Sequence, residues 1–476
     1  MAQPRTAAAA TATPTVQVIG PGRLGATAIA ALRVRGIEAR TASPELEPGD
    51  DVIAWALDAA PSVAVAVELS RACARAAGAG KPVCLLAPRS RGGNRPALER
   101  AAALAFLRAH GAALSHDVDA WLESIVLLVR FGLPTGPRAA VIAPPGSWLE
   151  AQATVIVEEA EAIGSRGPSI GTAVGGTDLP TDVVLYDPAL DPPPRSIPGM
   201  HVPVVARGEL ADSPLVLHGA RSALAAVATL GRAAERIAVG LGPAARTASA
   251  ELAIDDERLR RQLGKLGHDA GRLGDHETKV LLSSYGVPIT RQAVATTPSA
   301  AVKLARRAGY PVELKPWGHD LPTEPAGCPV EHGVTSDALV RQGFSGVLAA
   351  AGKTGVEGAA VIVRETPPQG REVAVTLVEL PALGWTVVLH VPGVSQPIAA
   401  PAPLRLIDAE ELAAHVVASR AGDPEPDRVG LANLLRRVSH LVVDLGSRLV
   451  ALELPRVIVG GRGTRTLVVD AAAELR

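Results

Sequence analysis

A lysine at the end of an apolar segment is the first residue in this chain that could do chemistry. The segment 310–315 reads YPVELK, and its last four residues predict a short buried strand over 312–315. Lys315 ends that strand, where a compact cation with several donors can reach a bound phosphate. We therefore expect Lys315 to contact an anionic ligand.

Two helices must position this lysine. Apolar residues spaced three and four apart predict one helix over 277–285 and a second over 298–308. The segment 286–288, Gly-Val-Pro, ends the first helix because glycine and proline interrupt helical geometry, and a short strand follows it.

A glycine turn near the N-terminus is a second candidate site. The strand expected at 16–19 runs into Gly20, Gly22 and Gly25, which form a G-x-G-x-x-G pattern before a helix. Such a turn can present backbone N–H groups to an anion at the helix N-terminus. A dinucleotide site would add an acidic residue after the second strand, but that strand ends in Arg40, which would favour the 2′-phosphate of NADP.

The chain from Glu277 to Lys315 resembles the opening of the ATP-grasp domain of the NDP-forming acyl-CoA synthetases, which are relatives of succinyl-CoA synthetase. Its two motifs are E-x-K-x-L-L-x-x-Y-G-V-P and G-Y-P-V-x-L-K, and the family's lysine binds nucleotide. The segment 81–93 is similar to K-P-V-x-x-L-K-x-G-R-S-x-x-G in the succinyl-CoA-ligase-like flavodoxin domain of the same proteins. The resemblance does not include the family's separate N-terminal CoA-binding domain.

The resemblance implies an α/β fold with two flavodoxin-like, doubly wound domains followed by a two-lobed ATP-grasp domain. We expect a disordered tail at 1–15, the two flavodoxin-like domains at 16–133 and 134–240, a charged linker at 241–274 and the ATP-grasp domain at 275–476.

The same resemblance implies a set of site residues. Lys315 would bind nucleotide phosphate, and Arg364 and Glu365 belong to a strand and hinge like the one that holds adenine. Glu372 lies in an intact G-R-E-V strand start, whose preservation could equally be structural because only the apolar face of the strand must survive. Glu453 stands where the family has a metal-binding aspartate, so ATP and magnesium are the cofactors implied for this domain.

Two stretches depart from the family pattern. The family's S-H-T-G segment, whose histidine accepts phosphate, has no counterpart between 91 and the helix expected at 97–109, and neither His110 nor His116 falls at that place. Phosphate relay is therefore not implied for this chain by itself, and whether CoA binds stays open.

The phosphate-covering segment also differs. Thr323 and Glu324 stand where the family has histidine and lysine, and Cys328-Pro329 stands where it has two glycines. A glutamate repels phosphates, and proline donates no backbone hydrogen bond. In the metal motif, Pro455 and Arg456 replace asparagine and proline. These changes work against ATP, so weak nucleotide binding is the expectation.

Composition limits the partners. The 476 residues carry 47 Lys and Arg against 48 Asp and Glu, and a net charge of −1 does not attract nucleic acid or an anionic membrane. The three cysteines have neither disulfide nor metal-site spacing, as in a reduced cytoplasmic protein. No signal peptide or membrane anchor is expected at the N-terminus.

Three functions remain open from the sequence. The first is a catalytically degenerate homologue that acts as a binding, scaffold or regulatory protein. The second is a working acid–CoA ligase subunit, completed by a separate CoA-binding subunit that supplies the histidine. The third is an NADP-binding protein that uses the turn from Gly20 to Gly25. A homo-oligomer is the alternative to a separate partner subunit.

Overall fold

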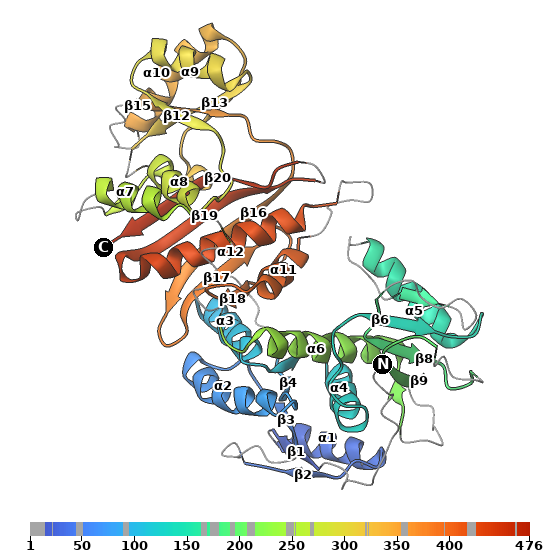
Figure 1. The fold of residues 1–476 in the computed structure, drawn as a ribbon. Helices are drawn as coiled ribbons and strands as arrows, with labels where there is room; N and C mark the ends of the chain where they lie inside the picture. The colour runs from blue at the N-terminus through green and yellow to red at the C-terminus, as the bar shows by residue number, and fades with distance from the viewer. Residues whose placement is uncertain are drawn as a thin grey trace. The chain divides into compact units, whose positions relative to one another are not determined.

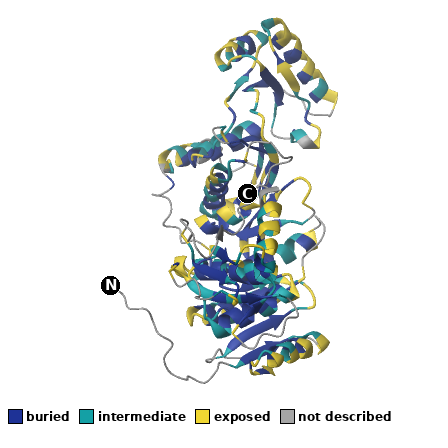
Figure 2. Cartoon of the chain, turned by 90° about the vertical axis from the view of Figure 1, so that its right-hand side faces the viewer, coloured by how far each residue is buried: buried dark blue, intermediate teal, exposed yellow. Residues whose placement is uncertain are grey.

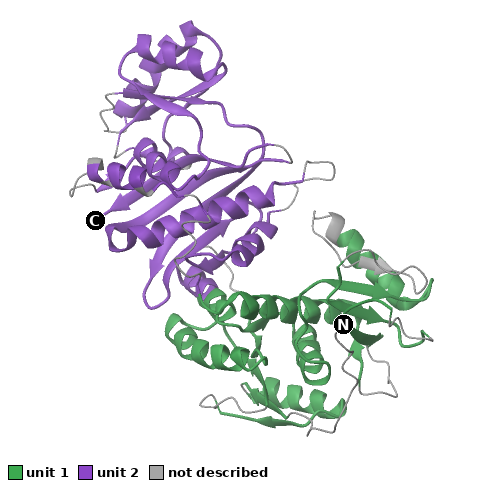
Figure 3. Cartoon of the chain, viewed as in Figure 1, with its two compact units in different colours: residues 1–90, 103–242 green, residues 91–102, 243–476 purple. Residues whose placement is uncertain are grey.

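The computed structural model describes residues 15–476 except 21, 44–50, 89–94, 163–168, 172–179, 191–195, 207–214, 244–251, 253, 267–270, 319–320, 322, 354–359, 395, 417–424 and 462–463. The chain divides into two compact units (Figure 3), one made of residues 1–90 and 103–242, the other of 91–102 and 243–476. Most of the expected N-terminal tail and the basic turn after residue 88 lie outside the described residues.

The first unit contains two five-stranded parallel sheets (Figure 1). Their orders, β2-β1-β3-β4-β5 and β10-β9-β8-β6-β7, both correspond to the 2-1-3-4-5 order of flavodoxin-like sheets. The first sheet comprises β1 (Val16–Ile19), β2 (Ala39–Thr41), β3 (Val52–Ala56), β4 (Cys84–Leu86) and β5 (Ala113–Ser115); the second comprises β6 (Ala139–Ile142), β7 (Ser169–Gly171), β8 (Val183–Tyr186), β9 (Met200–Val205) and β10 (Leu217–His218).

Helices cover both faces of the first sheet. Val52 and Ala54 of β3 pack in one apolar cluster with Leu32 and Trp121, whereas Ile53 and Trp55 pack in another with helices from the opposite face. This is the alternation expected of a strand that is buried on both sides. The helices that accompany the two parallel sheets are α1 (Gly22–Val34), α2 (Val63–Gly78), α3 (Arg95–Ala109), α4 (Val118–Arg130), α5 (Trp148–Ala162) and α6 (Ala220–Val239).

One apolar core joins the two parallel sheets. It includes residues of α4 and α6 together with strands of both sheets. Glu123 of α4 is buried in this region, where it pairs with Arg35 and accepts a hydrogen bond from the backbone N–H of His218 at 3.1 Å. The expected α/β fold with parallel sheets is confirmed, and Figure 2 shows buried residues concentrated in the strands.

The second unit has a larger and a smaller lobe, each built on an antiparallel sheet (Figure 1). In the larger lobe the strand order is β11-β20-β19-β16-β17-β18, and residues of α8 and α12 share one apolar core with these strands. The larger lobe contains α7 (Asp256–Leu266), β11 (Arg272–Leu273), α8 (Asp275–Ser284), β16 (Arg371–Leu380), β17 (Gly384–His390), β18 (Ile398–Pro401), α11 (Leu406–Ala414), α12 (Arg428–Leu445), η3 (Gly446–Arg448), β19 (Leu449–Val459) and β20 (Leu467–Leu475).

The smaller lobe is a four-stranded sheet in the order β12-β15-β13-β14, packed against two helices. The helix expected at 298–308 is present with those bounds, and the strand expected at 312–315 extends two residues further, to Trp317. The smaller lobe contains β12 (Gln292–Ala295), α9 (Pro298–Ala308), β13 (Val312–Trp317), β14 (Glu331–Val334), α10 (Asp337–Lys353) and β15 (Ala360–Glu365), and the short helix η2 (Glu324–Ala326) follows β13.

The segment 241–274, expected to be a linker, carries two elements of the second unit. Helix α7 contacts α8, and the two-residue strand β11 pairs antiparallel with β20. The charged composition of α7 reflects its exposed face, since Leu259 on the same helix joins the apolar core of the larger lobe. Among the described residues, no helix has the length and apolar character needed to cross a membrane.

Gly231 lies where α6 approaches the loop before β6, so a substitution there tests how close that approach is. A Cβ at this position would lie 2.4 Å from the backbone carbon and oxygen of Gly136. We expect Gly231→Ala to lower the free energy of unfolding by about 1–3 kcal/mol, as overpacking typically does. Urea unfolding followed by circular dichroism measures the change. Gly78→Ala is the control, because nothing lies within 4 Å of a Cβ there; an equal loss in both variants would contradict the close approach.

Candidate functional site

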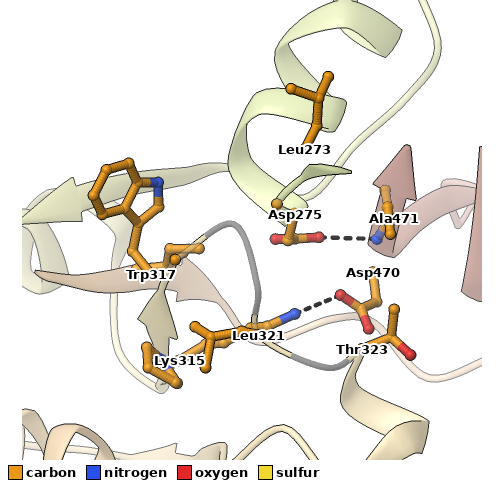
Figure 4. A pocket seen from close by; sticks show the side chains of 13 residues that line it. Leu273, Asp275, Lys315, Trp317, Leu321, Thr323, Asp470 and Ala471 are labelled. Carbon is orange, nitrogen blue, oxygen red and sulfur yellow. Dashed lines mark hydrogen bonds and ion pairs between the residues drawn. The ribbon is translucent and has the colours of Figure 1, made fainter. Parts of the chain in front are cut away.

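Lys315 lies in a buried position where the two lobes of the second unit meet. It is the fourth residue of β13, its register partner on β15 is Ile362, and it is only 3% exposed. Its Nζ donates to Oδ1 of Asp470 on β20 at 2.5 Å (Figure 4). Burial lowers the pKa of Lys315, but the Asp275 and Asp470 carboxylates outweigh burial and raise it. The ammonium group is therefore charged at neutral pH and already paired.

Asp470 joins this lysine to the segment that follows β13. Its side chain is fully buried, and its second oxygen accepts a hydrogen bond from the backbone N–H of Glu324 at 2.6 Å. One carboxylate of the larger lobe thus holds both the lysine of the smaller lobe and the start of η2.

A second buried ion pair lies beside the first. Lys279 of α8 donates to Asp275 at 3.0 Å and to the backbone oxygen of Val469 at 2.6 Å. It also donates to Thr290 and Gln292. Burial lowers the pKa of Lys279 to about 8, although the Asp275 carboxylate acts in the opposite direction. Four acceptors around one ammonium group make this lysine a structural cation that ties α8 to β20.

Arg364 is the third buried cation of this region. Its side chain has no exposed surface, and it donates to Glu313 at 2.7 Å, to the backbone oxygen of Val469 at 3.1 Å and to Glu324 at 2.7 Å. Burial lowers the pKa of Arg364, but the Glu324 and Glu313 charges more than compensate and raise it. The guanidinium is held between a strand of its own lobe and the η2 segment.

Glu324 bridges two arginines that come from different lobes. Its Oε2 accepts from Arg364 of β15, and its Oε1 accepts from Nη1 of Arg456 on β19 at 2.6 Å. Arg456 also pairs with Glu372 at 3.0 Å. The residue that stands where the resembled family has a lysine is therefore a carboxylate bound to two guanidinium groups.

The space left at this site is small. A cavity of about 10 Å³ is lined by residues that include Asp275, Lys315, Thr323 and Asp470 (Figure 4). That volume accommodates about one water molecule and no phosphate group. In the arrangement described, a nucleotide phosphate can reach Lys315 only if some of the lining residues move.

The other expected nucleotide-site residues lie around the same lobes. Glu365, at the end of β15, pairs with Arg291 through its side chain and also accepts the backbone N–H of Arg291 at 2.9 Å. Glu372 is the second residue of β16 and is half-exposed beside Arg456. Lys315, Arg364 and Glu372 thus join one network of ion pairs through Glu324, Asp470 and Arg456, whereas Glu365 makes a separate pair.

The expected metal ligand, Glu453, lies exposed on β19. Its register partners are Thr376 on β16 and Ala472 on β20, so it lies near Asp470 along the sheet. Magnesium needs carboxylate oxygens that are free to coordinate it. Asp470 already binds Lys315 and the N–H of Glu324, and the described residues contain no group of three or more His, Cys, Asp or Glu side chains placed to hold a metal. With Asp470 already bound, Glu453 is the exposed carboxylate of this pair and the one that could ligate the magnesium of a bound nucleotide, whose other ligands are phosphate oxygens and water.

The three glycines of the N-terminal turn belong to the first unit. A Cβ on Gly20 would lie 3.1 Å from the Cβ of Ala56, and one on Gly25 would lie 3.2 Å from the oxygen of Gly20. Gly22 has a φ of +40°, which disfavours side chains with a Cβ. The packing of Gly20 against β3, the packing of Gly25 against Gly20 and the positive φ of Gly22 explain these glycines without a ligand. Arg40, which would favour NADP, pairs with Asp51 at 3.0 Å.

Three carboxylates of the site were not identified from the sequence. Asp470 follows the apolar run 467–469, which is the same signal that pointed to Lys315, so it could have been found. Asp275 precedes Lys279 by four residues, which is the spacing of an ion pair on one helix, so it too had a local signal. Glu313 carried no such signal and became a site residue because β13 brings it next to Arg364.

Comparison with known proteins identifies the second unit. Residues 265–475 match the ATP-grasp domain family. This part of the chain is an ATP-grasp domain. The match begins within the segment expected to be a linker, in agreement with the pairing of β11 in the larger lobe.

Relatives of the ATP-grasp domain are ADP-forming acid–CoA ligases. The chain is 25% identical over 214 residues to the beta subunit of acetate–CoA ligase [ADP-forming] II of Pyrococcus furiosus, covering 42% of this chain and 91% of that subunit. It is 24% identical over 213 residues to 4-hydroxybutyrate–CoA ligase [ADP-forming] of Nitrosopumilus maritimus, covering 42% of this chain and 30% of that ligase. The resemblance to NDP-forming acyl-CoA synthetases is confirmed for this domain.

A solved structure gives a similar match. The dinucleotide-forming acetyl-coenzyme A synthetase 1 of Ca. Korarchaeum cryptofilum, in complex with coenzyme A, Ca-AMPCP and HgCl+, is 26% identical. The match covers 46% of this chain and 99% of that chain, with a TM-score of 0.41.

Substitution of Lys279 tests whether its buried ion pair with Asp275 stabilises the ATP-grasp domain. We expect Lys279→Met to lower the free energy of unfolding by about 3–5 kcal/mol, because the Asp275 carboxylate would remain buried without its partner. The double variant Asp275→Asn/Lys279→Met should regain part of that loss, since no unpaired charge remains. Urea unfolding measures both, with Lys303→Met on the exposed face of α9 as control. A loss no larger than the control's would contradict a stabilising role for the pair.

Proposed function

We propose that this chain is a catalytically degenerate homologue of the ADP-forming acid–CoA ligases, acting as a binding, scaffold or regulatory protein. The observation that carries the proposal is the pairing of Lys315 with Asp470 at the place where the family's lysine binds nucleotide. Phosphoryl transfer depends almost wholly on positioning and on neutralisation of phosphate charge. A lysine whose charge is already neutralised by a carboxylate attracts a phosphate only weakly.

The charges around Lys315 support the same proposal. Four cations, Lys279, Lys315, Arg364 and Arg456, face five carboxylates, those of Asp275, Glu313, Glu324, Glu372 and Asp470. Like-charge repulsion would oppose a polyphosphate in such surroundings unless a carboxylate moved away. Weak nucleotide binding without turnover is the behaviour that these charges favour.

The proposal includes a layout of two flavodoxin-like domains followed by the ATP-grasp domain. The two strand orders support flavodoxin-like domains at 16–133 and 134–240, ahead of the ATP-grasp domain. In this proposal the parallel-sheet domains supply binding surfaces, and the ATP-grasp domain serves as a folded partner domain. CoA is not assigned to any described residue.

The alternative is a working ligase subunit completed by another chain. Two of the relatives are beta subunits, which implies a partner subunit in those proteins. Lys315 and Arg364 are present at one site, so this chain would supply part of a nucleotide site while the partner supplied the CoA site and the phosphate-accepting histidine. The NADP alternative through Gly20–Gly25 has less support, because Arg40 is paired with Asp51.

Turnover by the purified chain tests the proposal. We expect no acyl-CoA and no ADP above background with ATP, magnesium, CoA and either acetate or 4-hydroxybutyrate, because each lost electrostatic group typically costs on the order of 10²-fold in rate. Lys315→Ala should behave like the unaltered chain, as should Lys303→Ala, which alters an exposed lysine on α9. Product formation that Lys315→Ala abolishes and Lys303→Ala preserves would establish the ligase alternative. The measurement is product quantification by liquid chromatography.

A further inference from the structure

Glu324 holds the two lobes of the ATP-grasp domain together through charge. Its two carboxylate oxygens bind guanidinium groups of different lobes, Arg364 at 2.7 Å and Arg456 at 2.6 Å. Its backbone N–H is bound to the fully buried Asp470 carboxylate. One residue therefore makes contacts to β15, β19 and β20.

The two guanidinium groups around Glu324 form a site for an anion. Arginine holds carboxylate and phosphate oxygens with the same planar set of N–H donors. Each oxygen of Glu324 is bound by a different arginine, so the carboxylate occupies the position that a ligand's anionic group would take between them. Burial raises the pKa of the Glu324 carboxyl, but the Arg364 and Arg456 charges outweigh burial and lower it, so the group is ionised at neutral pH.

The described residues next to Glu324 make hydrogen bonds within the turn, and η2 also contacts β19. The neighbours of Glu324 in the turn bond one another, with Ala326 N–H donating to Thr323 at 3.0 Å and Cys328 N–H donating to Thr323 at 3.2 Å. Gly327 adopts a φ of +101°, which lets the chain turn back directly after η2. Withdrawal of this turn would break its charged contacts to the lobes while leaving its internal hydrogen bonds intact.

We propose that Glu324 is an autoinhibitory latch, whose carboxylate fills the anion site between Arg364 and Arg456, so that a polyphosphate binds only after the Glu324 turn withdraws. This inference deepens the proposed function and rests on it, because it identifies Glu324 as the group that occupies Arg364 and Arg456 in place of a ligand. Removal of the Glu324 charge leaves both arginines in place, with Glu313 still paired to Arg364 and Glu372 still paired to Arg456. The N–H donors that Glu324 occupied are then free to bind a ligand's anionic group.

Binding to the full chain tests the latch. Isothermal titration calorimetry with ADP and with inorganic tripolyphosphate compares the unaltered chain, Glu324→Gln and Glu324→Ala. We expect both variants to bind at least one of the two probes about tenfold more tightly than the unaltered chain, as the release of charge-assisted hydrogen bonds would allow. Glu331→Gln is the matched control, because Glu331 is an exposed glutamate on β14 and should leave binding unchanged.

The two probes separate two ligand sources. Tighter binding of ADP alone indicates a nucleotide as the ligand, and tighter binding of tripolyphosphate as well indicates that the polyphosphate group suffices. Adding Arg456→Gln to Glu324→Gln should remove the gain, since it removes one of the two donors.

Several outcomes would overturn the latch. Affinities of both Glu324 variants within twofold of the unaltered chain would do so, as would an equal gain in Glu331→Gln. Loss of folding in both Glu324 variants would also overturn it, because a contact that must open to admit a ligand cannot be required for folding. Acyl-CoA formation by the unaltered chain would instead reject the proposed function, and the binding comparison would still decide whether Glu324 restricts the site.

Discussion

The arrangement of the ATP-grasp domain depends on neutralising charges that the fold buries. Lys279, Lys315 and Arg364 are each no more than 3% exposed, and an unpaired charge in such a position is strongly unfavourable. Lys315 and Arg364 pair with carboxylates of other elements, whereas Lys279 pairs with Asp275 of its own helix and reaches β20 through the backbone oxygen of Val469. These contacts are complete only when α8, β13, β15 and β20 assemble correctly. The ion pairs therefore constrain which lobe arrangements are allowed, even where they add little net stability relative to apolar packing.

The same pairing limits what the site can bind. The cations that would attract a polyphosphate are the cations that the fold must neutralise, and Asp470 and Glu324 neutralise them from within the chain. A site with free cations would favour ligand binding at a cost in stability, whereas a self-paired site favours the closed fold. In the proposed latch, the Glu324 carboxylate shifts that balance toward the self-paired site.

The first unit satisfies a different constraint. Its strands are parallel and short, and they become stable only when both faces are covered by helices. The shared core of the two sheets includes Leu127 and Leu230, which are fully buried on α4 and α6. The continuous apolar run of β3 meets this requirement by local pattern alone. The charged site of the second unit, by contrast, depends on contacts between residues far apart in the chain.

The local pattern of apolar residues in the sequence predicted several elements of this fold. Apolar spacing predicted α9 with its observed bounds, and the position of Lys315 at the end of an apolar run placed it correctly on β13. The resemblance to the family also predicted that Glu324 stands where the family has a lysine. These features depend on neighbours within a few turns or strand residues, which periodicity records.

Only the tertiary structure decided how those charges pair. Asp470 lies 155 residues from Lys315, and Val469 lies 190 residues from Lys279, so neither contact leaves a local signal. Strand β11, within the segment expected to be a linker, was missed for a related reason. A strand of two residues shows no periodicity and is defined only by its pairing with β20. Register between distant strands is a property of the assembled sheets, and it determined which carboxylate meets which cation.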